Sequence, residues 1–232
     1  MWCLLILSTV LALGALADKS GSTGQGKGKG GAASSNYTVT EEVWMDVEIK
    51  DFDGPGDDYR GRLVIGVFGE TCPMTTMNFI NIAKGFRTGK RFLTYKNSKF
   101  HRVIPDFLVQ GGDNEVGDGS GGLSIFGGTF VDENFKMSHT SAGIVSMANH
   151  GKDTNGSQFF LLLSRARWLD GKHVAFGKLV KGYDVLKTIG EVQMVRDTTE
   201  PKKTIKVVDS GVNNLEKSYT LSEKDYLKEE DL

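Results

Sequence analysis

The sequence predicts an all-β fold, a closed antiparallel barrel accompanied by two helices. The first observation behind this is composition: thirty glycines and only four prolines in 232 residues are more typical of a chain with many tight turns than of a helical bundle. The second is the pattern of residues 100–177, in which short apolar runs alternate with glycine-rich loops. Many short strands with few helices are typical of a barrel.

The expected elements begin near residue 43. Residues 43–49 and 62–68 alternate apolar and polar side chains, and the glycine-containing segment 51–58 between them predicts a β-hairpin with a long loop. Residues 73–84 are expected to form a helix, because a proline occupies the first turn and a glycine follows the last. A second short helix is expected at residues 183–189 and a final strand at residues 205–208.

The beginning of the chain differs in composition from the rest. Residues 2–17 are apolar or small and end in Ala-Leu-Ala, which predicts a secretory signal over residues 1–17. A membrane anchor and a buried helix are the alternatives, but a span needs roughly 20 apolar residues. Residues 18–38 are rich in Gly, Ser and Lys and are expected to be a flexible linker. Asn36 starts a glycosylation sequon at its edge.

The end of the chain is charged. Residues 216–232 contain six acids and three lysines, so a solvated tail over residues 215–232 is expected. The segments before it leave residues 39–214 as the folded domain. The last four residues, Glu-Glu-Asp-Leu, are similar to the retrieval ending Lys-Asp-Glu-Leu, which favours the lumen of the endoplasmic reticulum, with secretion as the alternative.

Composition also limits the classes of chemistry. A net charge of −1 gives no support to a nucleic-acid partner or a membrane surface. After residue 17 no apolar run is long enough to cross a bilayer, so no membrane insertion is expected. The protein is expected to be a monomer. Of the two cysteines, Cys3 lies in the expected signal, so Cys72 would remain as a single structural thiol. The four histidines lack metal-ligand spacing, and no phosphate loop or nucleophile elbow is present. No metal or cofactor is therefore expected.

Residues 100–111 (FHRVIPDFLVQG) indicate a site. An unpaired arginine in so apolar a run is costly unless a glutamine or a ligand satisfies its donors. The positions of Arg102 and Gln110 differ by an even number, so a strand would place both side chains on one face. Pro105 must interrupt the ladder between them. For Arg102 taken alone, a surface salt bridge is the commoner explanation.

Three further motifs accompany this run: SMAN at 146–149, NGSQFF at 155–160 and WLDGKH at 168–173. Together the four motifs closely resemble the cyclophilins, which are peptidyl-prolyl cis-trans isomerases, and the resemblance extends from about residue 43 to about residue 213. It implies an eight-stranded antiparallel barrel capped by two α-helices and an isomerase that needs no cofactor. Its expected partners are proline-containing peptides and unfolded client proteins, with cyclosporin as an inhibitor.

The resemblance also assigns a site, residue by residue. Arg102 corresponds to the catalytic arginine and Gln110 to the residue that orients it, while His173 lies on the wall of the proline pocket. The remaining positions correspond to the pocket and to the groove for the flanking peptide: Phe107, Leu108, Gly119, Ala148, Asn149, Gln158, Phe160, Trp168 and Leu169. Trp168 corresponds to the indole donor for cyclosporin. The aromatic members have an alternative as ordinary core residues.

Two positions depart from the family pattern. Leu108 stands where methionine is usual, a volume-conserving change. His150 stands where alanine is usual, at the groove wall, so it bears on specificity more than on activity. Three hypotheses follow: an isomerase that assists folding in the secretory pathway, a binding module or holdase with the same groove and little catalysis, and a secreted barrel of unrelated purpose. The last leaves the four motifs unexplained.

Overall fold

The computed structural model describes residues 37–228. The predicted signal, nearly all of the predicted linker, Asn36 and the last four residues lie outside the described residues. The helices are α1 (Pro73–Lys84), α2 (Tyr183–Gly190), α3 (Glu223–Leu227) and the short 3₁₀ helix η1 (Arg167–Leu169). The strands are β1 (Thr38–Val39), β2 (Glu41–Gly54), β3 (Asp57–Val67), β4 (Phe86–Thr88), β5 (Arg91–Leu93), β6 (Phe100–Ile104), β7 (Leu108–Gly111), β8 (Ile144–Met147), β9 (Phe159–Leu162), β10 (Ala175–Lys181), β11 (Ile205–Asn213) and β12 (Tyr219–Thr220).

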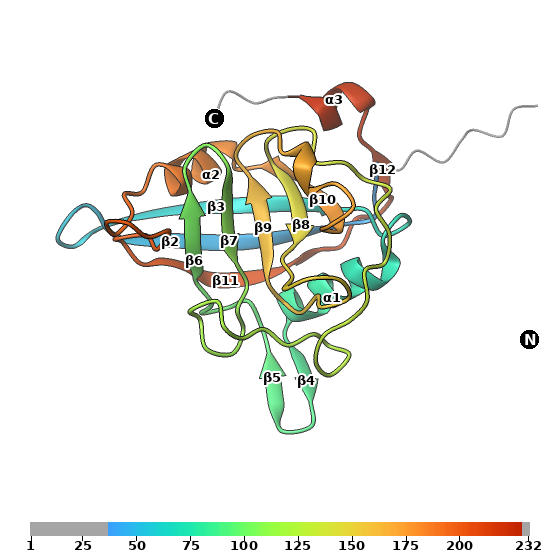
Figure 1. The fold of residues 1–232 in the computed structure, drawn as a ribbon, viewed down its shortest axis with the longest axis horizontal. Coiled ribbons are helices and arrows are strands. Elements are labelled where there is room, and N and C mark those ends of the chain that lie inside the picture. The colour runs from blue at the N-terminus through green and yellow to red at the C-terminus, as the bar shows by residue number, and fades with distance from the viewer. Residues whose placement is uncertain (1–36, 229–232) are drawn as a thin grey trace, which may run out of the picture. The chain divides into compact units, whose positions relative to one another are not determined.

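Eight strands form one antiparallel sheet in the order β11-β2-β3-β10-β8-β9-β7-β6 (Figure 1). The sheet curls until its two edge strands meet, where a bridge joins Lys99 to Lys206 and the amide of Asn97 donates to the carbonyl of Val207 at 2.7 Å. Closing a sheet in this way covers the edges that would otherwise expose unpaired backbone groups. The predicted eight-stranded barrel is confirmed, with closure that is nearly complete.

The β2–β3 hairpin is longer than predicted. A long loop was expected over residues 51–58, but strand pairing resumes at Gly54 and Asp57, so that Pro55 and Gly56 alone form the turn. The register shifts between Ile49 and Gly54, and Asp51 in this interval has a left-handed φ of 52°. An irregularity of this kind absorbs extra residues and lets the ladder continue. The long-loop prediction was wrong for that reason.

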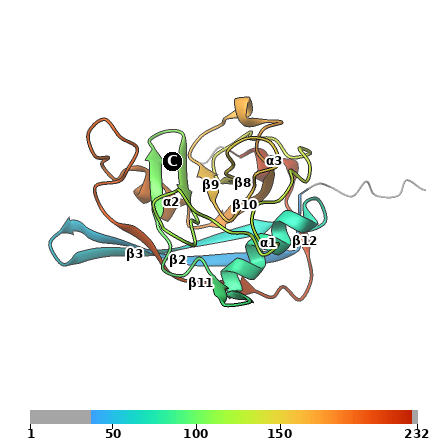
Figure 2. The same ribbon diagram turned by 60° about the horizontal axis from the view of Figure 1, so that its bottom comes forward.

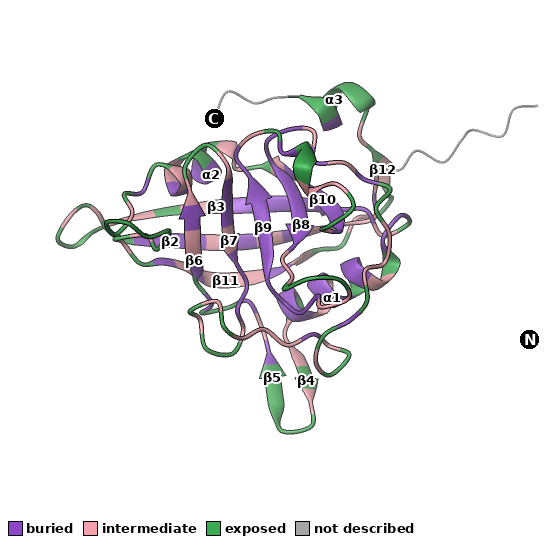
Figure 3. Ribbon diagram, viewed as in Figure 1, coloured by how far each residue is buried: buried purple, intermediate pink, exposed green. Residues whose placement is uncertain are grey.

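Strand β9 separates two apolar clusters because its side chains alternate between the two faces of the sheet. Phe159 and Leu161 belong to the main cluster, whereas Phe160 and Leu162 belong to a second one. All four residues are buried, so both faces of this strand are covered (Figure 3). The second cluster also contains Leu108, which lines a cavity together with Phe160.

Two helices pack against the barrel, as predicted (Figure 2). Helix α1 has the predicted bounds and packs on β11 and β2, while α2 contacts β3, β7 and β6. The carboxylate of Glu133 accepts hydrogen bonds from the backbone amides of Met74 and Thr75 at 2.9 and 2.8 Å, which satisfies donors that α1 leaves unpaired. Over residues 37–228, no helix is both long and apolar enough to cross a membrane.

The segment after residue 214 differs from the solvated tail that was expected. Strand β12 pairs with β1, and α3 places Tyr226 in the second cluster with 1% of its surface exposed. The Tyr226 ring stacks on Tyr37 at 4.2 Å, and its hydroxyl donates to the carbonyl of Ser138 at 2.7 Å. The buried ammonium of Lys178 donates to the carbonyl of Tyr226 at 2.9 Å. This part of the chain is therefore a docked third helix.

Candidate active site

Arg102 and Gln110 lie directly opposite each other on the β6–β7 hairpin. The Nη1 group of Arg102 donates to Oε1 of Gln110 at 3.1 Å. Their proximity was predicted on the basis of one strand face, but Pro105 lies in a turn between two strands, and the two residues are cross-strand partners. The prediction that they meet is confirmed, while the geometric reason was incomplete: the turn folds the run back on itself. Directly opposed positions on one face bring Cβ atoms to about 4.5–5.5 Å.

A chain of amide hydrogen bonds continues from this pair. Gln110 Nε2 donates to Oε1 of Gln158 at 2.9 Å. Gln158 Nε2 in turn donates to the carbonyls of Gly119 and Gly121, at 2.8 and 2.7 Å. These bonds engage both the oxygen and the nitrogen of the Gln110 side-chain amide: the oxygen faces Arg102 and the nitrogen faces Gln158. The guanidinium is therefore oriented by a network anchored to backbone.

The contacts of Arg102 are electrically neutral. Within residues 37–228, no carboxylate lies within ion-pair distance of its guanidinium, and the side chain is half-buried. An arginine carries its charge throughout the accessible pH range and presents donors in a fixed planar fork. The site therefore holds a partly desolvated cation with donors still available to a ligand.

Arg102 lines a cavity of about 400 Å³. Ten of the twelve predicted site residues line it: Arg102, Phe107, Leu108, Gln110, Gly119, Ala148, Asn149, Phe160, Leu169 and His173. His101 and Asp118, which were not among the predicted site residues, line it as well. His150, the expected departure at the groove wall, is the thirteenth lining residue. Strands β6, β7 and β9 thus build an apolar floor with a cation at one side.

The other two predicted residues lie beside this cavity. Gln158 lines a second cavity of about 190 Å³, which shares Gln110, Ala148, Asn149 and His150 with the first. Trp168, the middle residue of η1, is 60% exposed, and its ring lies 5.4 Å from that of Phe107 in a tilted arrangement. The two cavities together form one groove, and the indole of Trp168 stands at its rim.

The wall formed by residues 167–173 is held by the buried side chain of His139. Asp170 Oδ1 accepts from the backbone amide of His139 at 2.8 Å and lies 2.9 Å from its Nδ1. The other ring nitrogen lies 2.9 Å from Ser146 Oγ, and the imidazole stacks on Phe160 at 6.1 Å. Burial lowers the pKa of His139, although Asp170 opposes that shift. A neutral His139 therefore links the pocket floor to its wall.

His173 presents a defined face to the cavity. Its Nδ1 lies 2.9 Å from the carbonyl of Met147, which only accepts, so this nitrogen carries the proton. Burial lowers the pKa of His173, and the ring meets Phe160 edge-to-face at 5.4 Å. The side chain is therefore a neutral, fixed wall of the pocket with Nε2 left unprotonated.

The side chain of Asn149 connects loops of the protein itself. Its Nδ2 donates to the carbonyl of Lys172 at 2.8 Å, and its Oδ1 accepts from the amide of Gly151 at 3.2 Å. These two bonds tie the segment after β8 to the wall that carries His173. The Asn149 side chain is thus engaged within the protein, which leaves its backbone as the part that faces the groove.

A buried carboxylate shapes the loop on the opposite side. Asp113 is 2% exposed and accepts backbone N–H bonds from Glu115, Val116, Gly119 and Gly121 at 3.0–3.2 Å. Burial alone would raise the pKa of Asp113, but these donors hold it below its usual value. Sequence analysis missed this residue; the only local signal is an acidic residue directly after Gly111-Gly112.

Gly119 is required by a close approach within this loop. Its φ is 94°, and a Cβ at this position would lie 2.6 Å from Nε2 of His101. Only glycine adopts this conformation readily, and only glycine leaves room for the imidazole. The loop that receives the Gln158 amide is therefore set by backbone geometry.

Cys72 lies away from the groove. Its thiol is buried, which raises its pKa to about 12, and it packs in the main cluster at the start of α1. A thiol with so high a pKa is not a nucleophile near neutral pH. The prediction of a structural cysteine is confirmed.

Comparison with known proteins agrees with this geometry. A family model described as cyclophilin type peptidyl-prolyl cis-trans isomerase/CLD matches residues 45–212. Peptidyl-prolyl cis-trans isomerase B of Saccharomyces cerevisiae is 41% identical over 213 residues, covering 91% of this chain and 94% of the relative. Isomerase D of the same yeast is 45% identical, covering 75% and 72% of the two chains, and isomerase CYP21-1 of Arabidopsis thaliana is 43% identical, covering 76% and 77%. The chain belongs to the cyclophilin family and is a peptidyl-prolyl cis-trans isomerase.

Proposed function

We propose that this isomerase accelerates X-Pro isomerisation in client proteins folding in the secretory pathway, with Arg102 as the catalytic residue. The observation that carries the assignment is a guanidinium with a neutral partner, Gln110, beside an apolar cavity of about 400 Å³. A prolyl ring fits such a cavity, and its amide then lies within reach of the cation.

The chemistry of the reaction explains why a cation is placed there. A planar amide resists rotation by about 18–20 kcal/mol because its C–N bond has partial double-bond character. Rotation returns the lone pair to the prolyl nitrogen, so a donor aimed at that nitrogen stabilises the twisted form more than either planar form. Arg102 is that donor, and the hydrogen bond that it donates to Gln110 Oε1 reduces the reorganisation it needs.

The remaining residues of the groove bind the substrate. Phe107, Leu108, Phe160 and Leu169 form the apolar pocket for the proline ring, with His173 as its wall. Ala148 and Asn149 contribute backbone to the flanking peptide, and Gln158 with Gly119 forms the neighbouring subsite. An acceleration of about 10⁶ needs about 8 kcal/mol, which a charge-assisted donor, the pocket and the backbone contacts share.

An assay with a short proline peptide, with and without cyclosporin, tests this proposal. We expect catalysed isomerisation that the drug abolishes. The cyclophilin family binds cyclosporin generally, and for this chain the exposed indole of Trp168 beside Phe107 is the proposed donor to the drug. Trp168→Ala should therefore retain turnover and lose most of its sensitivity. If the unmodified protein still turns over the peptide at a saturating concentration of cyclosporin, the assignment of Trp168 as the donor to the drug is refuted.

A second candidate function is a holdase that binds proline segments with little catalysis. His150 favours it, because this side chain lines both parts of the groove. The same assay separates the two functions. Binding of the peptide without turnover by the unmodified protein would support the holdase, whereas turnover with weak binding would support the enzyme.

The cellular location is proposed on composition. The apolar residues 2–17 favour entry into the secretory pathway, and Glu229–Leu232 favours retrieval to the endoplasmic reticulum. Deleting residues 2–17 should leave the protein in the cytosol, and deleting Leu232 should send it into the medium. Equal secretion with and without Leu232 would remove the retrieval role.

Asn36 is the proposed glycosylation site. The second sequon starts at Asn155, whose side chain is fully buried and donates to Asp132 Oδ1 at 2.8 Å. A glycan requires an exposed asparagine, so Asn155 is expected to stay unmodified. Asn36→Gln should abolish the whole endoglycosidase-sensitive mass shift. A shift that survives in this variant would contradict the assignment.

A further inference from the structure

The β4–β5 hairpin carries positive charge with almost no compensation. Residues 84–99 contain six lysines and arginines and no acidic residue. Arg87, Lys90 and Arg91 are exposed on the hairpin, which projects away from the barrel in Figure 1. The proposed isomerase mechanism does not use this segment.

An apolar group accompanies these charges. Phe92 is 56% exposed, and the Arg87 guanidinium lies 5.7 Å from the centre of its ring. A large aromatic residue on a protruding hairpin covers no core, and an arginine above it presents both an apolar and a charged surface to a ligand. The hairpin therefore offers more than diffuse charge.

One contact ties the hairpin to the substrate groove. Arg91 Nη1 pairs with Glu115 Oε1 at 3.2 Å, and the other carboxylate oxygen accepts from the amide of Gly122 at 3.1 Å. Glu115 and Gly122 both line the second cavity of the groove. Within residues 37–228, this carboxylate is the single ion-pair partner of the three hairpin cations. The basic surface thus begins where the groove ends, with Arg87 and Lys90 still unneutralised.

We propose that the β4–β5 hairpin is a second recognition surface, which binds acidic residues of the same client segment whose proline occupies the catalytic cavity. This rests on the proposed function of the groove. An extended peptide spans about 3.3–3.6 Å per residue, and the second cavity adjoins the catalytic one through Gln110 and Asn149. A segment that passes through both cavities approaches Arg91 at Glu115, and the test peptides place their charges about three to six residues from the proline to cover this approach. Opposite charge at that distance raises the rate of encounter and favours one register.

The test compares matched proline peptides at low and high salt. One peptide carries three acidic residues three to six positions before the proline, a second carries them after it, and a third has Gln and Asn in their place. The readout for each protein is the ratio of kcat/KM for an acidic peptide to that for the neutral peptide. For the unmodified protein we expect this ratio to be about threefold to tenfold on one side of the proline and near one on the other, and to fall towards one at high salt.

The variant Arg87→Gln/Lys90→Gln keeps the Arg91–Glu115 pair and should bring the ratio close to one. The matched control, Lys187→Gln/Lys217→Gln, removes the same charge from exposed positions elsewhere and should keep the full ratio. Arg87→Glu/Lys90→Glu should reverse the preference towards a lysine-containing peptide. A ratio near one for the unmodified protein, or an equal loss in the control variant, would overturn the proposal. Failure of the enzyme to turn over the neutral peptide would count against the proposed function instead.

Discussion

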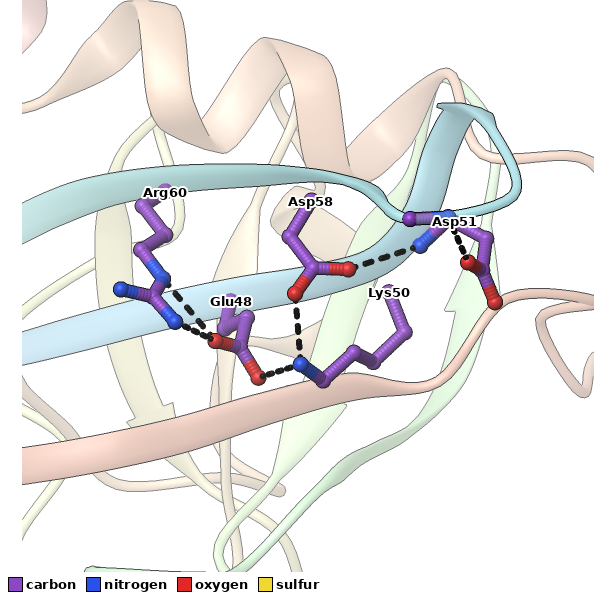
Figure 4. A network of polar contacts seen from close by, with 6 residues as sticks. Glu48, Lys50, Asp51, Asp58 and Arg60 are labelled. Carbon is purple, nitrogen blue, oxygen red and sulfur yellow. Dashed lines mark hydrogen bonds and ion pairs between the residues drawn. The ribbon is translucent and has the colours of Figure 1, made fainter.

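Two hairpins of this barrel use arginine in opposite ways. On β2–β3, Arg60 donates from Nε and Nη2 to one oxygen of Glu48, at 2.9 and 2.6 Å (Figure 4). The other oxygen of Glu48 pairs with Lys50 at 3.0 Å, and Lys50 pairs with Asp58 at 2.5 Å. On β6–β7, Arg102 meets the neutral amide of Gln110. The first hairpin neutralises its cations, whereas the second leaves its cation without a counter-charge.

The difference shows where each charge is used. Hydrogen bonds from Lys50 and Arg60 hold the pKa of Glu48 below its usual value, so these groups stabilise each other. A carboxylate beside Arg102 would satisfy the same donors permanently and leave little for a substrate. An amide orients the guanidinium without cancelling its charge. The charges of the ion network therefore interact with each other within the fold, whereas the Arg102–Gln110 pair is suited to act on a substrate.

The largest expected effect comes from removing each arginine in turn. Arg102→Ala should lower kcat by about 10²–10³-fold, or about 3–4 kcal/mol, by analogy with the loss of an oxyanion-hole donor, while peptide affinity falls far less. Arg102→Lys should recover little, because a flexible point charge does not replace a fixed fork. The matched variant Arg60→Ala should leave turnover unchanged. Exchange spectroscopy with circular dichroism measures both, and a folded Arg102→Ala with near-normal turnover would refute the mechanism.

The next largest effect is expected from giving Arg102 a charged partner, as the arginine of the β2–β3 ion network has. Gln110→Glu places a carboxylate beside Arg102 and should lower kcat by about tenfold to hundredfold, because a hydrogen bond to a charged group is worth about 1.5–3 kcal/mol. Gln110→Met is the matched control: it loses the hydrogen bond, keeps the charge of Arg102 available, and should lower kcat less. If the two variants lose the same activity, the neutrality of the partner is not what matters.

The two regions should also lose stability in different pH ranges. Burial lowers the pKa values of His101, His139 and His173 in the folded protein. In the unfolded chain these histidines have the ordinary pKa of about 6.5, so below that pH the unfolded chain binds more protons than the folded protein. Their contribution is complete above about pH 6.5 and is lost as the pH falls towards their folded pKa values, by about 1.36 kcal/mol per pH unit for each group. The contribution of Glu48, whose pKa is also lowered, should persist until the pH falls below the ordinary glutamate pKa of 4.5.

Urea unfolding between pH 7.5 and pH 4 measures this separation. We expect the free energy of unfolding to decrease between about pH 6.5 and pH 5 in the unmodified protein, and less steeply in His139→Gln. The variant Glu48→Gln should decrease like the unmodified protein in that interval. A free energy of unfolding that stays constant from pH 6.5 to pH 5 would contradict the role of the groove histidines.

The smallest effect is expected from the ion network itself. Glu48→Gln should reduce the free energy of unfolding by about 1 kcal/mol or less, because the Arg60 and Lys50 side chains are 70% and 49% exposed and water screens their charge. Added salt should diminish the difference, and turnover should stay unchanged. A loss of activity in this variant would show that the β2–β3 hairpin communicates with the groove.

Elements whose signals are local could be predicted from the sequence. Pro73 and Gly85 mark the two ends of α1, and alternation on β2 and β3 indicates strands, because capping and side-chain period depend only on neighbouring residues. The sequence also identified Arg102 and Gln110, since a charged residue in an apolar run needs a partner. The four motifs then pointed to ten residues that the fold brings to one cavity.

Contacts that join distant segments of the chain could not be predicted from the sequence. His139 and Asp170 are 31 residues apart, and the four amides that hold Asp113 belong to an irregular loop, so neither has a periodicity that a sequence displays. The tail was expected to be solvated because its composition is charged, yet Tyr226 buries its ring against Tyr37 and bonds to Ser138, 88 residues away. Composition reports the average preference of a segment for water, whereas docking depends on particular contacts, here the buried Tyr226 ring with its satisfied hydroxyl, the bond from Lys178 and the pairing of β12 with β1.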